Sequence, residues 1–182
     1  MAITATDIVY HYSIKTGAAG DTASQPDPNA SLGKYVATNS PTSGTVHHLF
    51  DKLTGPENAA GAGEVEYRCI FVRNNHATLT WESVVVWLSN VVAGGADAAI
   101  SVDTTAASDA DSASAQAKEV VDESTAPAAQ SFSAPITKGT GLSIGDLAPD
   151  QVRAIWIRRT ATNSAALNND GATLTCEGDT AA

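Results

Sequence analysis

The sequence is poor in the residues that cross-link small folds. Cys69 and Cys176 are its two cysteines among 182 residues, which excludes a disulfide framework and permits at most one bridge. Both cysteines lie in strand-like, inward-facing contexts, where a free cysteine usually acts as a small apolar side chain. A chain of this length buries roughly 70% of its unfolded surface and therefore needs no disulfide or metal to fold. We expect both thiols to be reduced and buried.

Basic residues and long apolar runs are also scarce. Ten Lys and Arg residues stand against twenty Asp and Glu residues, which gives a formal net charge of -10. Nucleic acid and anionic membranes would repel such a chain, so we expect neither as a partner, whereas a positively charged protein surface would be attracted. No run approaches the ~20 apolar residues of a membrane-spanning helix, and the N-terminus lacks the features of a signal peptide. We therefore expect synthesis in the cytoplasm without export by that route.

Most motifs of known catalytic and metal sites are missing as well. The sequence has no phosphate-binding Gly-rich loop, no Cys-x-x-Cys and no His-Glu-x-x-His. Gly-x-Ser-x-Gly occurs once, at residues 141–145, but these residues lie in an expected strand and not at the strand-to-helix turn that a nucleophilic serine of this motif requires. His47 and His48 would point to opposite faces of a strand and cannot easily hold one metal. The acidic positions between 109 and 123 lack the spacing of a calcium loop. We expect no catalytic residues, no cofactor and no metal.

The densest apolar stretch covers residues 64–88 and contains two apolar runs separated by a polar turn. In the first run, residues 65–72, side chains alternate with the two-residue period of a strand. Asn74, Asn75 and His76 supply turn chemistry. The second run, residues 79–88, is rich in β-branched and aromatic residues, which favour strands. We predict an antiparallel pair of strands at the centre of a β-sandwich.

Further short strands are predicted along the rest of the chain, with Gly, Pro and Asn residues between them. A short strand or turn is expected at 46–53. The other expected strands lie at 7–15, 98–103, 142–147, 151–160 and 172–177. This pattern predicts an all-β fold, an immunoglobulin-like antiparallel β-sandwich that forms a single domain over residues 1–182.

Two long segments are expected to lie outside the regular strands. Residues 16–44 are rich in Gly, Pro, Asp and Asn, which predicts an extended arm with at most a short element near Tyr35 and Val36. A loop of this length is usually functional, and this arm is the first candidate for reaching a neighbouring molecule. Residues 104–117 have low complexity and predict an exposed loop, with a turn or two of helix as the less favoured alternative.

A few side chains are candidates for surface contacts. Trp87 and Trp156 lie in apolar strands and are expected in the core, whereas Trp81, between Thr80 and Glu82, is kept as a surface candidate. The basic cluster of Arg153, Arg158 and Arg159 has two interpretations that the sequence leaves open. These arginines pair with nearby carboxylates, or they form one side of a contact between subunits.

Several motifs in the same order resemble a family of structural proteins of tailed bacteriophage virions. In the first half, the resemblance rests on Asp-Pro-Asn-Ala-Ser-Leu-Gly at 27–33, Leu-Phe-Asp at 49–51 and Glu-Tyr-Arg-Cys-Ile at 66–70. In the second half, it rests on Gly-Leu-Ser-Ile-Gly-Asp-Leu at 141–147, Ala-Ile-Trp-Ile-Arg-Arg-Thr at 154–160, Asn-Asn-Asp-Gly at 168–171 and Glu-Gly-Asp-Thr at 177–180. The resemblance spans most of the chain and brings no catalytic residues with it.

The resemblance implies a non-enzymatic virion component, made in the host cytoplasm. We expect a capsid decoration protein, or cement, that binds the major capsid protein or other virion proteins and forms a homo-oligomer, for instance a trimer. A tail or baseplate protein is the alternative within this class. The candidate interface residues are Asp27, Pro28, Asn29, Leu32, Tyr35, Trp81, Arg158 and Arg159.

Two further classes remain as alternatives. A carbohydrate-binding adhesion module would need Trp81 or Tyr35 on the surface beside polar groups, and burial of all three tryptophans would count against it. An enzyme is the weakest option, because no nucleophile, base and orienting group can be nominated together.

Overall fold

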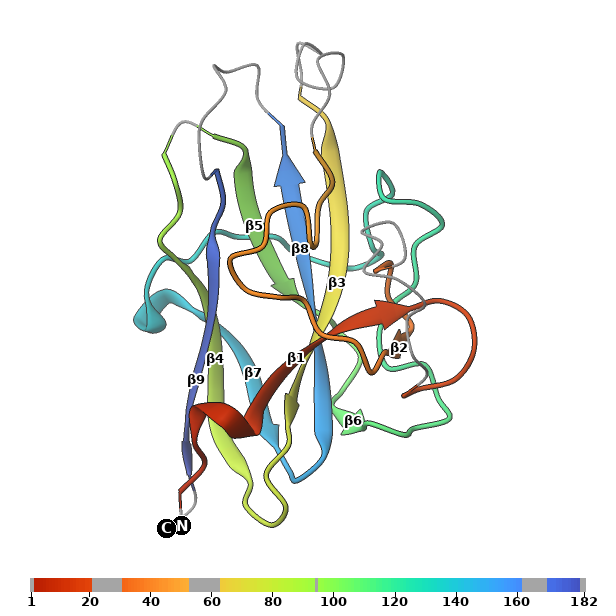
Figure 1. The fold of residues 1–182 in the computed structure, drawn as a ribbon, viewed down its shortest axis with the longest axis vertical. Helices are drawn as coiled ribbons and strands as arrows, with labels where there is room; N and C mark the ends of the chain where they lie inside the picture. Colours follow the sequence, from red (N-terminus) through yellow and green to blue (C-terminus); the bar gives the residue numbers. More distant parts are fainter. Residues whose placement is uncertain (1, 21–30, 53–62, 94, 162–169, 181–182) are drawn as a thin grey trace.

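The computed structural model describes residues 2–20, 31–52, 63–93, 95–161 and 170–180, which form two antiparallel β-sheets (Figure 1). The larger sheet has the strand order β2-β1-β3-β8-β5, with β6 also paired to β8, and the smaller sheet has the order β7-β4-β9. The described residues contain 3-10 turns η1 (Ala5–Asp7) and η3 (Lys138–Thr140), and none of their helices could cross a membrane. The strands are β1 (Ile8–Ile14), β2 (Tyr35–Val36), β3 (Val65–Asn74), β4 (Trp81–Ser89), β5 (Asp97–Val102), β6 (Ser108–Asp109), β7 (Leu142–Leu147), β8 (Gln151–Thr160) and β9 (Thr173–Thr180). The prediction of an all-β antiparallel sandwich is confirmed.

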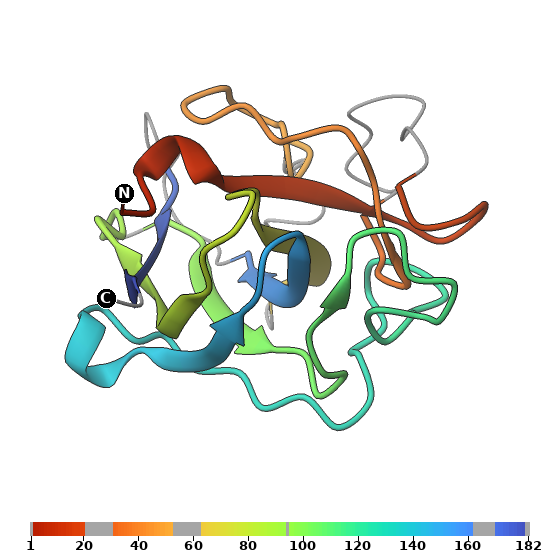
Figure 2. The same cartoon turned by 90° about the horizontal axis from the view of Figure 1, so that it is seen from below.

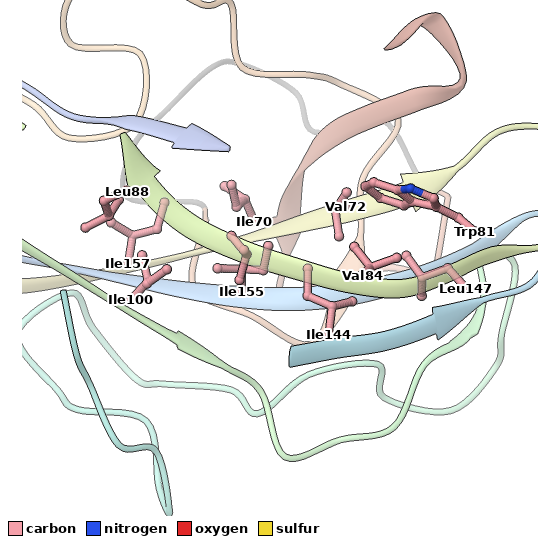
Figure 3. Packing of buried hydrophobic residues seen from close by; sticks show 11 residues of the cluster. Ile70, Val72, Trp81, Val84, Leu88, Ile100, Ile144, Leu147, Ile155 and Ile157 are labelled. Carbon is pink, nitrogen blue, oxygen red and sulfur yellow. The ribbon is translucent and has the colours of Figure 1, made fainter. Parts of the chain in front are cut away.

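The main core lies between the two sheets (Figure 3). Alternate residues of each strand face this space, as the two-residue period of a strand requires. The larger sheet contributes Ile70 and Val72 from β3 and Ile155 from β8, and the smaller sheet contributes Val84 from β4 and Leu147 from β7. Each of these side chains is almost completely buried.

A second core lies on the opposite face of the larger sheet. The intervening residues of β3 and β8, among them Phe71 and Trp156, point to this face, where irregular segments cover them. These segments supply Leu32, Ala117 and Val120. Figure 2 shows them gathered beside the larger sheet, on the side away from β4, β7 and β9. The larger sheet is therefore buried on both faces, which is unusual for an antiparallel sheet.

Strands β3 and β4 do not form the predicted antiparallel pair. β3 lies between β1 and β8 in the larger sheet, whereas β4 lies between β7 and β9 in the smaller sheet. The two strands therefore belong to different sheets, and each has a neighbour on both sides. The turn between them crosses from one layer to the other. The Asn74 side-chain amide fixes this crossing, because its Nδ2 donates to the carbonyl oxygens of Leu79 (2.8 Å) and Leu147 (2.9 Å).

Several other sequence-based predictions can be compared with the structure. Strands at 142–147 and 151–160 are confirmed at both ends, and the predicted strand at 172–177 continues to Thr180. Of the strand or turn expected at 46–53, the turn is found: residues 46–50 form turns and bends, and the described part of the segment contains no strand. Cys69 and Cys176 are free, as expected. Cys69 is buried in the outer core, whereas Cys176 is only partly buried and packs against the inter-sheet core.

The predictions for the two long segments were partly wrong. Tyr35 and Val36 form the short element expected in the arm, but this element pairs with β1 and holds the described part of the arm on its own sheet. The segment at 104–117 contains β6 and no helix, and it is not simply exposed, since Gln116 and Ala117 are buried. The Gln116 side chain bonds to the backbone of two short strands, β2 and β6, as a neighbouring strand would. Its Oε1 accepts the Val36 N–H (2.9 Å) and its Nε2 donates to the Asp109 carbonyl (2.8 Å).

Candidate functional site at one end of β3 and β8

The end of β8 carries two neighbouring arginines that point to opposite faces of the larger sheet. Arg159 lies opposite Glu66 of β3, and Arg158 lies opposite Tyr67. Because successive side chains of a strand alternate, Arg159 shares the inter-sheet face with Ile157, whereas Arg158 shares the outer face with Trp156. Two distinct polar sites therefore lie back to back at this end of the sheet.

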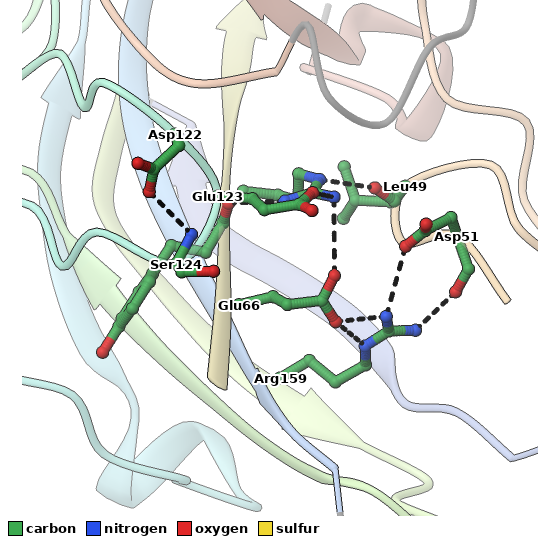
Figure 4. A network of polar contacts seen from close by, with 9 residues as sticks. Leu49, Asp51, Glu66, Asp122, Glu123, Ser124 and Arg159 are labelled. Carbon is green, nitrogen blue, oxygen red and sulfur yellow. Dashed lines mark hydrogen bonds and ion pairs between the residues drawn. The ribbon is translucent and has the colours of Figure 1, made fainter. Parts of the chain in front are cut away.

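The inner network consists of Asp51, Glu66, Arg68, Glu123 and Arg159 (Figure 4). Arg159 donates from Nε to Glu66 Oε2 (2.6 Å) and from a terminal nitrogen to the Asp51 carbonyl (2.7 Å). The Arg68 side chain is completely buried and forms ion pairs with Glu66 (3.7 Å) and with Glu123. Each buried charge in this network contacts a group of opposite charge, and such pairing offsets the cost of removing a charge from water.

The two arginines of the inner network hold the segment that contains Leu49, Phe50 and Asp51. Arg68 Nε donates to the Leu49 carbonyl (3.1 Å), and the Phe50 ring lies 5.3 Å from the Arg68 guanidinium carbon and 4.9 Å from that of Arg159. Leu49 and Phe50 also pack against the inter-sheet core. Figure 1 shows this orange segment between β9 and β3. The network thus fastens a loop over one side of the sandwich.

Three carboxylates of the inner network lie close enough together to suggest a cation site. Oxygens of Asp51, Glu66 and Glu123 lie within 4.8 Å of one another. However, the guanidinium groups of Arg68 and Arg159 are paired with these oxygens and already supply two positive charges. Burial raises the pKa of Glu66, and Arg159 acts against that rise. The geometry therefore supports a structural tie and not a metal centre.

The outer patch, on the other face, consists of Tyr67, Phe132 and Arg158. The Tyr67 and Phe132 rings are tilted, with centroids 5.4 Å apart, and the Arg158 guanidinium carbon lies 5.5 Å from the Phe132 centroid. All three residues are half-exposed. The Arg158 Nε is buried and has no hydrogen-bond partner. This patch combines an arginine with aromatic rings at the protein surface.

A third polar centre, Asp103, was not predicted from the sequence. This wholly buried carboxylate accepts the Trp156 Nε1–H (2.7 Å), the Lys118 N–H (2.9 Å) and the Thr105 N–H (2.7 Å). Arg153 donates to its backbone carbonyl (2.8 Å). Asp103 thereby holds the segment after β5 against the outer face of β8. An Asp at the end of a predicted strand is typical of a turn, so no sequence signal distinguished it.

The two open interpretations of the basic cluster apply to different members. Arg159 pairs with carboxylates of its own chain, Arg153 bonds to a carbonyl, and Arg158 makes neither kind of contact with the described residues. Tyr35 is half-buried beneath Lys34, whose Nζ lies 5.5 Å from the ring centroid. Asp27, Pro28 and Asn29 lie outside the described residues.

The prediction of Trp81 and Leu32 as surface contacts was wrong. Trp81 is 4% exposed and Leu32 is 6% exposed. Trp81 begins β4 with its ring directed into the inter-sheet core (Figure 3), and Leu32 packs in the outer core. Trp87 and Trp156 are 9% and 0% exposed, so all three tryptophans are buried, which counts against a carbohydrate-binding platform.

Comparison with known proteins adds no family to this description. No protein-family model, curated protein or solved structure matches the chain. The fold and the site define an all-β antiparallel sandwich in which buried polar groups tie irregular segments to the sheets.

Proposed function

We propose that this chain is a non-enzymatic structural protein of a tailed bacteriophage virion and that it decorates the capsid shell. One observation carries the proposal: the charged and polar residues that a catalytic site would use serve here to fix loops. Arg159 binds the segment at 49–51, Asp103 binds the segment at 105–118, and Gln116 binds β2. These described segments are therefore tied to the sheets by side chains of the sandwich.

A sandwich whose loops are tied to its sheets suits a subunit that docks between the subunits of an already assembled shell. Loops that are ordered before binding lose little conformational entropy when they dock, so more of the contact energy remains as affinity. The net charge of -10 favours a basic surface on the partner. The proposed partners are the major capsid protein or other virion proteins, and the resemblance of the sequence motifs to virion proteins supports the same assignment.

The proposal is tested on intact particles of the phage that encodes the chain. We expect cryo-EM density that fits this sandwich to repeat over the capsid lattice. Density confined to the tail would replace the decoration role with that of a tail or baseplate protein, and absence of the chain from purified particles would refute a virion role.

The cement role is tested separately by deletion. Particles that lack the chain should release their DNA at a lower temperature than wild-type particles, and adding back the purified chain should restore the wild-type release temperature. Equal release temperatures with and without the chain would contradict stabilisation of the shell. A glycan-binding assay on the isolated chain distinguishes the adhesion alternative, for which we expect no signal.

A further inference from the structure

Arg158 differs from the other arginines in how its charge is compensated. Arg68, Arg73 and Arg159 form ion pairs with carboxylates, and Arg153 donates to a carbonyl. Arg158 contacts the Phe132 ring and no carboxylate of the described residues. Its Nε, like that of Arg153, is buried and has no hydrogen-bond partner. The exposed part of the Arg158 guanidinium therefore has no opposite charge beside it in the described chain, and a carboxylate on another molecule can supply one.

The surroundings of Arg158 are those of a binding surface. Tyr67 and Phe132 flank it, and aromatic residues with arginine are the residue types most enriched at the energetic centres of protein interfaces. Strand β8 fixes the Arg158 backbone between β3 and β5, so the patch is held in place before any partner arrives. The chemistry of the outer patch therefore fits a carboxylate carried on a protein loop.

Carboxylates that could match Arg158 are present near the other end of β8. Asp109 and Asp111 are exposed, and their side chains accept no hydrogen bond from the described residues. Asp109 lies opposite Gln151 at the start of β8, whereas Arg158 lies seven residues further along that strand. At the rise of an extended strand this separation is about 23 Å, so the two sites cannot meet within one molecule.

We propose that the outer patch binds the turn at residues 109–111 of a second copy of this chain. The contact is heterologous, because one copy offers Arg158 and the next copy offers Asp109 and Asp111. Repetition of such a contact closes into a ring or continues as a chain of subunits. Although both copies carry a net negative charge, salt at physiological strength screens the overall repulsion beyond roughly 8 Å and leaves the short-range pair intact.

This proposal does not rest on a virion role, because it concerns the isolated chain in solution. Sedimentation velocity of the purified full chain should show self-association that increases with protein concentration and weakens with added salt. Arg158→Glu should weaken the association by at least about 30-fold, and so should the double substitution Asp109→Lys with Asp111→Lys. The double substitution changes two exposed side chains, at the end of β6 and in the turn after it, so it tests the contact even if a change on β8 impairs folding.

A charge-swap experiment identifies the two surfaces as partners. Mixing the Arg158→Glu protein with the Asp109→Lys, Asp111→Lys protein provides one native and one reversed contact, so association should return in the mixture. Lys52→Glu makes the same charge change at an exposed position outside the patch and should leave association unchanged. A wild-type chain that stays monomeric, full association of either variant alone, or failure of the mixture to associate would overturn the proposal.

Discussion

Replacing Asp103 with asparagine isolates the contribution of one buried carboxylate to the stability of the fold. The two side chains have nearly the same shape, so the change alters hydrogen bonding without leaving a cavity. In the wild type, Oδ2 accepts from Trp156 and from Lys118, and Oδ1 accepts from Thr105. Asparagine keeps one acceptor oxygen, and its amide group must face at least one of these donors.

The free energy of unfolding falls least when the oxygen of the asparagine side chain takes the place of Asp103 Oδ2. The Thr105 N–H is then left without an acceptor, which costs about 1–3 kcal/mol for a buried donor. The bonds to Trp156 and Lys118 become neutral instead of charge-assisted, and such bonds are roughly half as strong. We therefore expect Asp103→Asn to lower the free energy of unfolding by about 2–4 kcal/mol, a large part of the 5–15 kcal/mol of a typical domain.

Urea denaturation followed by tryptophan fluorescence measures this loss directly. Asp146→Asn is the matched control, because Asp146 is exposed and accepts one hydrogen bond, from the Ser83 N–H (2.8 Å). That control should cost less than about 1 kcal/mol. Hydrogen exchange at the Thr105 and Lys118 amides provides a local readout, and both should lose protection in Asp103→Asn. Equal stabilities of the two variants, with unchanged protection, would refute the assignment of Asp103 as a structural centre.

Three further predictions follow from individual groups. Burial raises the pKa of the Cys69 thiol well above its usual range and that of Cys176 to about 12, so neither should react with a thiol reagent at pH 8 until the chain is unfolded; a fast-reacting native thiol would contradict this. Burial also raises the pKa of Glu66, so its contribution to stability is present at acid pH and is lost as pH rises through the folded value. The unfolding free energy of wild type minus that of Glu66→Gln should therefore fall as the pH rises above the pKa of an ordinary glutamate, about 4. If the difference between wild type and Glu66→Gln instead rises with pH, ion pairing outweighs burial at Glu66. The unfolding free energy of wild type minus that of Asp7→Asn should rise with pH, because hydrogen bonds from Thr4 lower the pKa of Asp7. Gly33→Ala should cost about 3 kcal/mol or more in thermal denaturation, since Gly33 has φ +93° and an added Cβ would lie 1.9 Å from the Lys118 carbonyl oxygen; a melting temperature equal to that of the wild type would contradict this.

The strands were predictable where a local pattern was strong. β8 has apolar residues on both faces near its middle and follows a clear turn at Ala148, Pro149 and Asp150, so both its ends could be located from the sequence. The pairing of β3 and β4 was not predictable in the same way. Periodicity indicates that a segment is a strand, but the partner depends on the crossing that Asn74 fixes, and Leu147 contributes to that crossing from far along the chain.

The candidate site was likewise predictable only in part. Arg153, Arg158 and Arg159 were interpreted as one basic cluster, although the two-residue period of a strand separates Arg158 from Arg159, and nothing local showed which of them meets carboxylates. Glu66 and Asp51, the partners of Arg159, are brought to it by the fold from 93 and 108 residues away in the sequence. Likewise, the low-complexity composition of residues 104–117 gave no local sign that Gln116 would replace a strand partner for β2.

The position of β8 in the larger sheet determines when the chain can acquire its structure during synthesis. β8 lies between β3 and β5 and carries side chains of both cores, yet it is the last strand of its sheet to leave the ribosome. A nascent chain that ends before residue 151 has Phe71 and Ile70 on β3 without the strand that covers their flank. The segment from 103 to 133 has likewise been made before the surface to which it docks. Folding of both layers must therefore wait until β8 and β9 have been made, and termination before β8 leaves the larger sheet without its connecting strand.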